Sequence, residues 1–393
     1  MKNRINRVMK SFFGIKIRLG TVILACVVFA GVGWGASAYR QTQRYGGKDN
    51  FALAQKYLEV KKVIDDYYVG DADEKTLSDA SSAAMVKSLG DKWSYYMTPE
   101  EYEAYQLYSA NEYAGIGVTI QEDEASGGFL INAVTAGSPA EAAGVKAGEI
   151  MLAVDGESVS GMTVSEVRTL IRSHLDESVT VTIKSGNETR DVEIDCTIIY
   201  TKPVSYRLLD NGVGYIAISN FESGAGSGAI AAVDDLLAQG ASRFVFDVRS
   251  NPGGLLSELI KILDYLLPEG DIFVSVNEAG EETVTKSDNI CIEVPMAVLV
   301  NSDSYSAAEF FAAALSDFDW AVVVGTQTTG KARSQITLEL SDGSAVHVSS
   351  NEYLTPSRVD LSKQGGITPD VTAEMTETGD AQMEAAISAV LSK

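Results

Sequence analysis

Ser306 and Lys331 are the residues whose types suggest chemistry. The chain of 393 residues has only two histidines, His174 and His347. A serine hydroxyl is a weak nucleophile and needs an adjacent base. Because histidine is scarce, a lysine is the obvious substitute, provided that burial or neighbouring charges lower its pKa. Together with Gln335, which follows Lys331 closely, these residues favour a serine nucleophile activated by a lysine.

The elements that must position these residues predict an α/β core over residues 191–375. Near-continuous apolar strands separated by helices are typical of a mostly parallel, buried sheet. We expect strands at 213–219, 243–248, 296–300 and 321–325, and helices at 229–237, 255–267 and 307–315.

Ser306 follows the strand at 296–300 and precedes the helix at 307–315. The N-terminus of a helix stabilises developing negative charge, which suits a nucleophile. The alternative is an ordinary N-cap serine. Lys331 ends a loop that leaves the strand at 321–325, and Gln335 opens the next strand, on the same face as Lys331 if the chain between them is extended.

Residues 109–190 change character to short β-branched strands, Gly-rich turns and one amphipathic helix at 164–171. With a Gly115–Val118 loop, a stretch from Ser138 to Gly148 and a strand at 150–156 that closes with an Asp-Gly turn, this segment resembles a PDZ domain. Such domains bind the C-terminal end of an extended peptide. The resemblance implies a peptide-binding site at Ala114, Gly115, Ile116, Gly117 and Val118.

Over residues 51–375 the chain resembles the carboxyl-terminal processing proteases, which are PDZ-bearing S41-type serine peptidases with a Ser-Lys dyad. The motifs that carry this resemblance lie at 89–94, 247–254, 301–309, 330–335 and 366–370. The resemblance implies Ser306 as the nucleophile, Lys331 as the general base and Gln335 as the residue that orients Lys331.

The same resemblance implies an oxyanion hole formed by the backbone N–H groups of Ala307 and of Gly253 or Gly254. An ordinary turn before the helix at 255–267 is the alternative for the two glycines. The chain departs from the family pattern at Tyr305, Ala308, Asp303 and 332–334. These departures leave the dyad spacing intact and put the shape of the substrate pocket in question.

The N-terminal region predicts a membrane anchor. Residues 1–19 are basic and lack acidic residues, and the apolar segment 20–38 that follows is long enough to span a bilayer. We therefore expect a single-pass protein with its N-terminus inside and its catalytic region outside the cytoplasm. A signal peptide cleaved after 36–38 is the alternative. A linker at 39–50, a helical region at 51–108 and a C-terminal helix or tail at 376–393 complete the organisation.

The composition of the chain limits the classes of partner and cofactor that we expect it to bind. The formal net charge of −23 argues against nucleic-acid binding, which needs clustered Lys and Arg. No cofactor is predicted, and no metal-binding spacing is present in the sequence. A disulfide between Cys196 and Cys291 would be compatible with an oxidising compartment. Protein or peptide substrates with free C-termini are the expected partners, and a homodimer is possible.

The sequence thus predicts a multidomain α/β protein: a transmembrane helix, a helical region, a β-rich PDZ domain and a serine peptidase core. The predicted function is a membrane-anchored endopeptidase. A catalytically silent PDZ adaptor is the first alternative, and the retained Ser306, Lys331 and Gln335 argue against it. A Ser-His-Asp esterase is the second, but His174 falls in the PDZ-like segment and His347 in a strand.

Overall fold

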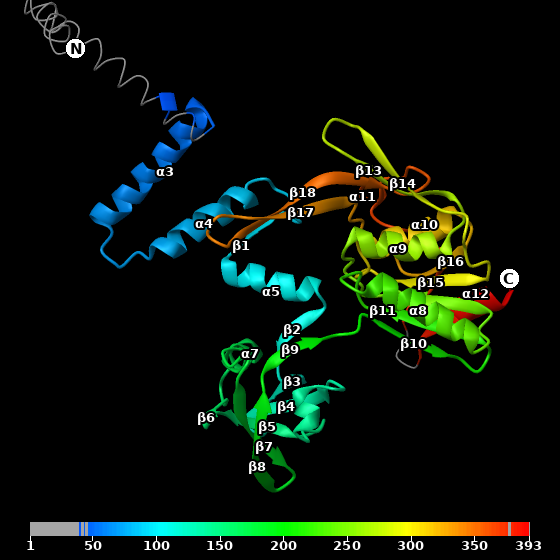
Figure 1. Cartoon of the computed structure of the whole chain (residues 1–393), viewed down its shortest axis with the longest axis horizontal. Helices are drawn as coiled ribbons and strands as arrows, with labels where there is room; N and C mark the ends of the chain where they lie inside the picture. The colour runs from blue at the N-terminus through cyan, green and yellow to red at the C-terminus, as the bar shows by residue number, and fades with distance from the viewer. Residues whose placement is uncertain (1–38, 41–42, 44–45, 376–378, 393) are drawn as a thin grey trace, which may run out of the picture. The chain divides into compact units, whose positions relative to one another are not determined.

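The computed structural model describes residues 39–40, 43, 46–375 and 379–392 (Figure 1). The chain divides into two compact units, Met1–Ser81 and Ser82–Lys393, which we treat separately. The predicted anchor at 20–38 lies outside the described residues. Within the described residues, no helix combines the length and the apolar character that a membrane crossing requires.

The first unit contains helix α3 (Lys48–Tyr67) and the first half of helix α4 (Glu74–Lys87). The predicted linker at 39–50 is wrong at its end, because Lys48, Asp49 and Asn50 already form the first turn of α3. No residue of α3 is buried. The three- and four-residue spacing of Leu53, Tyr57, Val60 and Val63 predicts this helix, and these exposed side chains give it an apolar face within its own unit.

Thr98 followed by Pro99 predicts the start of a helix, and helix α5 (Pro99–Ser109) begins there, with Pro99 at its first position. The Thr98 hydroxyl accepts a hydrogen bond from the Glu101 backbone N–H at 3.2 Å, and the Glu101 carboxylate accepts from the Thr98 N–H at 2.9 Å. This reciprocal capping box satisfies two helix-terminal donors. Strand β1 (Tyr95–Met97) lies just before α5. The sequence predicted a helical region at 51–108 and missed this strand.

The segment that resembles a PDZ domain forms a sheet of order β3-β4-β5-β7-β8. Its strands are β3 (Val118–Asp123), β4 (Gly128–Val134), β5 (Ile150–Val154), β6 (Glu157–Ser158), β7 (Ser178–Ser185) and β8 (Glu188–Asp195). Its helices are α6 (Pro139–Ala142) and α7 (Val164–Arg172). Strand β2 (Glu112–Gly115) leads into the domain and β9 (Thr197–Tyr200) leads out of it, and the two pair antiparallel.

The apolar sequence of residues 115–120 predicts one strand, but the structure interrupts it. Strand β2 ends at Gly115 and β3 begins at Val118. Gly117 between them has φ +92°, and a Cβ there would lie only 2.1 Å from Ser138 Cβ. This glycine is therefore required both by its backbone conformation and by the close approach of Ser138.

The predicted α/β core contains a six-stranded sheet of order β10-β11-β12-β15-β16-β19, parallel except for β10. The mostly parallel sheet predicted from the sequence is thus confirmed. The strands are β10 (Val204–Leu208), β11 (Val213–Ile218), β12 (Arg243–Asp247), β15 (Met296–Val300), β16 (Ala321–Gly325) and β19 (Val371–Thr372).

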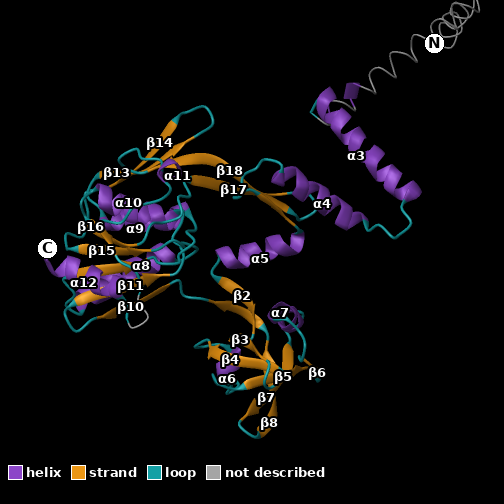
Figure 2. Ribbon diagram, turned by 180° about the vertical axis from the view of Figure 1, so that it is seen from behind, coloured by secondary structure: helices purple, strands orange, loops and turns teal. Residues whose placement is uncertain are grey.

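Helices cover both faces of this sheet (Figures 1 and 2). Helices α8 (Ala225–Ala238), α9 (Leu256–Leu266) and α10 (Ala307–Asp317) bury one face, and α12 (Ala381–Ser392) packs on the other. Arg249 links α12 to the core, because its guanidinium contacts Asp247 at 2.6 Å and Asp380 at 2.9 Å. Helices thus cover both faces of the sheet, and ligands in such sheets bind at the C-terminal ends of the parallel strands.

A second, antiparallel sheet adjoins the core and was not predicted as a unit. It has the order β1-β18-β13-β14, with β17 also paired to β18. Its strands, besides β1, are β13 (Gly270–Val276), β14 (Glu282–Ser287), β17 (Arg333–Glu339) and β18 (Ala345–Leu354). A short helix, α11 (Leu361–Gln364), follows β18. Because β1 pairs with β18, residues near 95 lie beside residues near 346.

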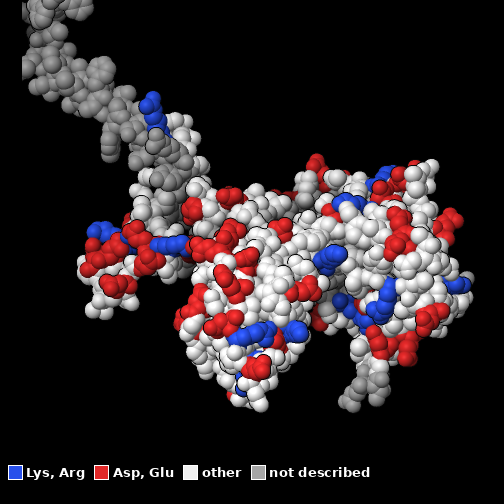
Figure 3. Space-filling model, turned by 60° about the horizontal axis from the view of Figure 1, so that its bottom comes forward, with Lys and Arg blue, Asp and Glu red and all other residues white. Residues whose placement is uncertain are grey.

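Acidic side chains are spread widely over the face shown in Figure 3, as the net charge of −23 requires. Cys196 is buried, Cys291 is partly buried, and both are free thiols, so the disulfide considered above is absent.

We predict that Phe311→Ala will destabilise the α/β core by about 3–5 kcal/mol. Phe311 is fully buried, and its ring packs edge-on against Phe246 with centroids 5.4 Å apart. Denaturant unfolding of the whole protein measures the effect. Leu391→Ala on α12 is the control, because that side chain is 46% exposed and should cost less than about 0.5 kcal/mol. Equal effects of the two changes would contradict the proposed core.

Candidate active site

Ser306 occupies a strained turn between β15 and α10. Its backbone has φ 58° and ψ −124°, a region that residues with a Cβ rarely adopt. The turn is held from outside: the Ser304 hydroxyl donates to the Val248 carbonyl at 2.7 Å, and the Tyr305 N–H donates to the Asn251 carbonyl at 3.1 Å. Strain of this kind persists only where surrounding structure enforces it, and it concentrates at functional sites.

The buried carboxylate of Glu309 joins the two halves of the site. Its Oε2 accepts from the Ser306 N–H at 2.9 Å and from the Lys331 N–H at 2.8 Å. Its Oε1 accepts from the Gly330 N–H at 2.7 Å and from the Thr328 hydroxyl at 2.5 Å. Glu309 is fully buried in the third position of α10, where the helix N-terminus favours a negative charge. One carboxylate therefore fixes the backbone of both Ser306 and Lys331.

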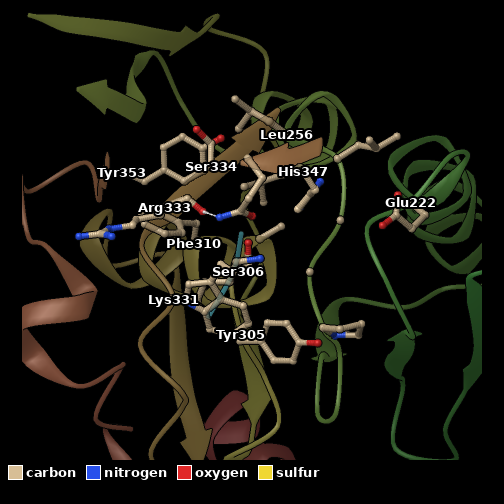
Figure 4. A pocket seen from close by; sticks show the side chains of 18 of the residues that line it. Glu222, Leu256, Tyr305, Ser306, Phe310, Lys331, Arg333, Ser334, His347 and Tyr353 are labelled. Atoms are coloured by element: carbon tan, nitrogen blue, oxygen red, sulfur yellow. Dashed lines mark hydrogen bonds between the residues drawn. The ribbon is translucent and has the colours of Figure 1, made fainter. Parts of the chain in front are cut away.

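Lys331 lines the same pocket as Ser306 (Figure 4). Burial lowers the pKa of its ammonium to about 8, against the opposing effect of the carboxylates of Asp91, Glu222 and Glu309. Its Nζ lies 4.5 Å from the centroid of the Trp93 ring, a cation–π distance. A lysine with this pKa is substantially neutral at mildly alkaline pH, as a general base must be.

Gln335 lines the pocket but is turned toward β18. Its Nε2 donates to the Arg333 carbonyl at 3.0 Å and to the Ser349 hydroxyl at 3.2 Å, and among the described residues it makes no hydrogen bond to Lys331. A β-bulge between Ser334 and Gln335 changes the register with β18. The prediction that Lys331 and Gln335 lie on the same face assumed that the chain between them is extended without interruption. The bulge interrupts it.

The predicted oxyanion donors lie against Ser306, but they are not equivalent. A Cβ on Gly253 would be 2.8 Å from Ser306 Cβ and 2.9 Å from the Ala307 nitrogen. The Gly253 N–H donates to Asn251 Oδ1 at 2.8 Å and is therefore already engaged. The N–H groups of Gly254 and Ala307 donate to no other described residue. Of the two glycines proposed, Gly254 is the better donor.

The rest of the pocket combines an apolar side with an aromatic rim. Leu256, Leu259, Phe273, Phe310 and Tyr353 form the apolar side, and Trp93, Tyr95, Tyr105, Tyr108 and Tyr305 contribute aromatic rings. The Trp93 and Tyr305 rings are 5.6 Å apart. Tyr305 therefore does contribute to the shape of the pocket.

His347 also lines this pocket, which the sequence did not indicate. Its Nδ1 lies 2.8 Å from Thr337 Oγ1, and its ring stacks on Tyr95 at 4.7 Å. Burial lowers its pKa to about 4, and the positive charge of Lys331 adds to this effect. An imidazole with so low a pKa is a weak base. The other histidine, His174, lies in the PDZ domain with its Nε2 3.0 Å from Asp155.

A second pocket, in the PDZ domain, contains all five residues predicted to bind peptide: Ala114, Gly115, Ile116, Gly117 and Val118. It runs between the start of β3 and helix α7, which contributes Val164, Arg168, Ile171 and Arg172. The Arg172 Nε donates to the Ala114 carbonyl at 3.2 Å. Strand β3 is at the edge of its sheet, so an extended peptide can pair beside it.

Residues 212–373 match peptidase family S41, and residues 130–185 match the PDZ domain family. A "Probable CtpA-like serine protease" from Staphylococcus aureus (strain MSSA476) is 30% identical over 366 residues, which span 92% of this chain and 72% of the relative. This chain belongs to peptidase family S41. A protein of the same name from Staphylococcus epidermidis (strain ATCC 12228 / FDA PCI 1200) is 32% identical over 78% of this chain and 62% of its own.

Solved structures agree with the S41 assignment. The photosystem II D1 C-terminal processing protease is 27% identical, with a TM-score of 0.51 over 90% of this chain and 96% of that protein. A putative S41 protease from Bacteroides fragilis NCTC 9343 has a TM-score of 0.55 over 81% of this chain and 91% of that one; at 17% identity it supports the fold alone. The chain is therefore a serine peptidase with a PDZ domain, as the sequence predicts.

Glu309 provides a test of how this S41 peptidase site is held together. We predict that Glu309→Gln will lower the free energy of unfolding by about 3 kcal/mol, because the amide NH₂ group faces N–H or O–H donors. We also expect kcat/KM for casein to fall by about 100-fold or more, because Ser306 and Lys331 lose their common anchor.

Glu258→Gln is the matched control. Glu258 is also a buried carboxylate, which accepts from the Gly226 N–H at 2.8 Å and from Lys261 at 2.7 Å, but it does not line the catalytic pocket. That variant should lose stability and keep kcat/KM. If Glu309→Gln retained full activity once folded, the anchoring role would be refuted.

Proposed function

We propose that this S41 peptidase hydrolyses protein substrates with Ser306 as nucleophile and Lys331 as general base, after its PDZ domain has bound the substrate's C-terminal tail. One observation supports the Ser306–Lys331 dyad. Ser306 and Lys331 are tied to the same buried carboxylate and line one pocket, and there burial lowers the pKa of Lys331 to about 8.

Each proton transfer of the proposed reaction has a donor and an acceptor. Ser306 Oγ attacks the carbonyl carbon of the peptide, and its proton passes to Lys331 Nζ. The N–H groups of Ala307 and Gly254 stabilise the oxyanion. The tetrahedral adduct collapses to an acyl-enzyme when the leaving amine takes the proton from Lys331. Water then attacks the ester, Lys331 accepts its proton, and that proton returns to Ser306 as the acid product leaves.

In this conformation the Lys331 ammonium lies over the ring of Trp93, and Gln335 is hydrogen-bonded to Ser349. We infer that this is a resting arrangement. For catalysis, Lys331 leaves the aromatic ring and points to Ser306, and Gln335 turns to orient it. Substrate or PDZ occupancy would favour the catalytic arrangement by binding to it more tightly.

The PDZ pocket supports recognition of a free C-terminus. Gly115 and Gly117 allow close backbone approach, and Arg168 and Arg172 add positive charge to the same pocket. A carboxylate held on loop N–H groups with the peptide paired beside β3 fits both features.

The protein's location and assembly belong to the same proposal. The basic segment 1–19 and the apolar segment 20–38 support a single-pass anchor with the N-terminus inside. The catalytic unit would then act outside the cytoplasm. A homodimer is compatible with the exposed apolar face of α3.

We predict that wild-type cleavage of casein will rise by about tenfold per pH unit below a pKa of about 8 and level off above it. The sign follows because protonated Lys331 cannot accept the serine proton. A kcat/KM profile from about pH 6 to about pH 10 measures this. A flat profile, or one that falls with rising pH, would contradict a lysine base.

Variants distinguish the dyad from other bases. Ser306→Ala and Lys331→Arg should each lose about 10⁴-fold or more in kcat, since a guanidinium does not deprotonate in a protein. Lys286→Ala, a change to a lysine that is 70% exposed, is the control and should retain activity. Equal cleavage by all variants would point to another site.

The PDZ proposal predicts discrimination between chain ends. Ser306→Ala protein should bind an apolar peptide with a free C-terminal carboxylate about tenfold or more tightly than the same peptide with a C-terminal amide, because the amide removes the charge. Fluorescence anisotropy with labelled peptides measures both affinities. Equal affinities would show that the PDZ domain does not recognise the carboxylate.

A further inference from the structure

Glu222 lies in the catalytic pocket and has no place in the mechanism above. It follows β11 in the loop at 219–224 and is only 7% exposed. Figure 4 shows it across the pocket from Ser306 and Lys331. A buried carboxyl group requires compensation by donors or cations.

Glu222 differs from the other buried acidic residues of the described chain. Glu149, Asp247, Glu258 and Glu309 each accept from a cation or from several N–H and O–H donors. Glu222 Oε2 is buried and makes no hydrogen bond of good geometry with the described residues. The Ser109 hydroxyl is close enough to lower the pKa of Glu222, but it too makes no hydrogen bond of good geometry. The fold by itself therefore compensates this carboxyl group only in part.

The loop cannot easily move the side chain away from the pocket. The Glu222 N–H donates to Asn220 Oδ1 at 2.9 Å, and the Ser223 N–H donates to the Ser109 carbonyl at 3.1 Å. A Cβ on Gly254 would lie only 2.6 Å from the Glu222 nitrogen, so this backbone packs directly against the oxyanion loop. The backbone of Glu222 is thus held against the loop that carries the Gly254 N–H.

When the enzyme is active, the negative charge of Glu222 has no cation of the protein to balance it. Burial raises its pKa to about 7, against the opposing effects of Ser109 and Lys331, so the group is ionised in the alkaline range. Tyr95 and Tyr108 also face it. Lys331 is the cation that acts on it, and Lys331 must be neutral to serve as base.

We propose that Glu222 is a specificity-determining residue, whose carboxylate accepts a hydrogen bond from a lysine or arginine side chain of the bound peptide close to the scissile bond. The inference rests on the proposed function of the pocket. The apolar side of the pocket, with Leu256 and Phe310, binds a different side chain of the same peptide. The acidic surface favours approach of such cationic substrates.

Peptide binding tests this without requiring catalysis. The full chain carrying Ser306→Ala is titrated with peptides in which lysine or norleucine occupies each position flanking the scissile bond in turn. At one position, lysine should bind about 10- to 100-fold more tightly than norleucine, as a charge-assisted hydrogen bond allows. Adding Glu222→Gln should abolish this preference and leave norleucine binding unchanged.

Controls keep the outcomes separate. Glu258→Gln in the same background should preserve the lysine preference. Raising the salt concentration should weaken only the lysine peptide, a measurement that needs no second variant. No lysine preference at any position, or a preference that survives Glu222→Gln, would overturn the proposal. Failure of Ser306-dependent cleavage of the norleucine peptides would instead count against the proposed function.

Discussion

The structure of the active site depends on one buried anion, the carboxylate of Glu309. Four donors from two separate segments converge on it, together with the N-terminal end of α10. An unpaired carboxylate in this position would be costly, but a fully hydrogen-bonded one at a helix N-terminus is not. Because Ser306 and Lys331 are bound to the same oxygen atom, any shift of one segment is transmitted to the other.

The features on which the proposed chemistry rests are those that a stable fold would otherwise avoid. Ser306 has a backbone conformation that few residues adopt, and the Lys331 ammonium is largely removed from water. These costs are offset by the packing beneath them, where Phe221, Phe246 and Phe311 form one buried aromatic group. The rigid sheet lets a strained turn persist in a single conformation.

Local sequence patterns were sufficient for the elements that carry Ser306, since an apolar strand, a turn and an apolar helix follow one another along the chain. They were insufficient for Trp93 and His347, which reach the pocket through pairing of β1 with β18. Strand β18 is half-buried over most of its length and shows no apolar alternation. Glu222 carries no local signal at all, because its significance comes from the donors that it lacks.

The PDZ domain leaves and rejoins the chain at neighbouring points, since Gly115 pairs with Thr197 across the β2–β9 ribbon. Paired Cα atoms in such a ribbon are about 5 Å apart. The whole domain is therefore inserted between two paired strands, in the place that a loop occupies in a β-hairpin. Recombination could insert, replace or delete the domain between these two residues without displacing the strands on either side, so the recognition of substrates could evolve separately from the chemistry of cleavage.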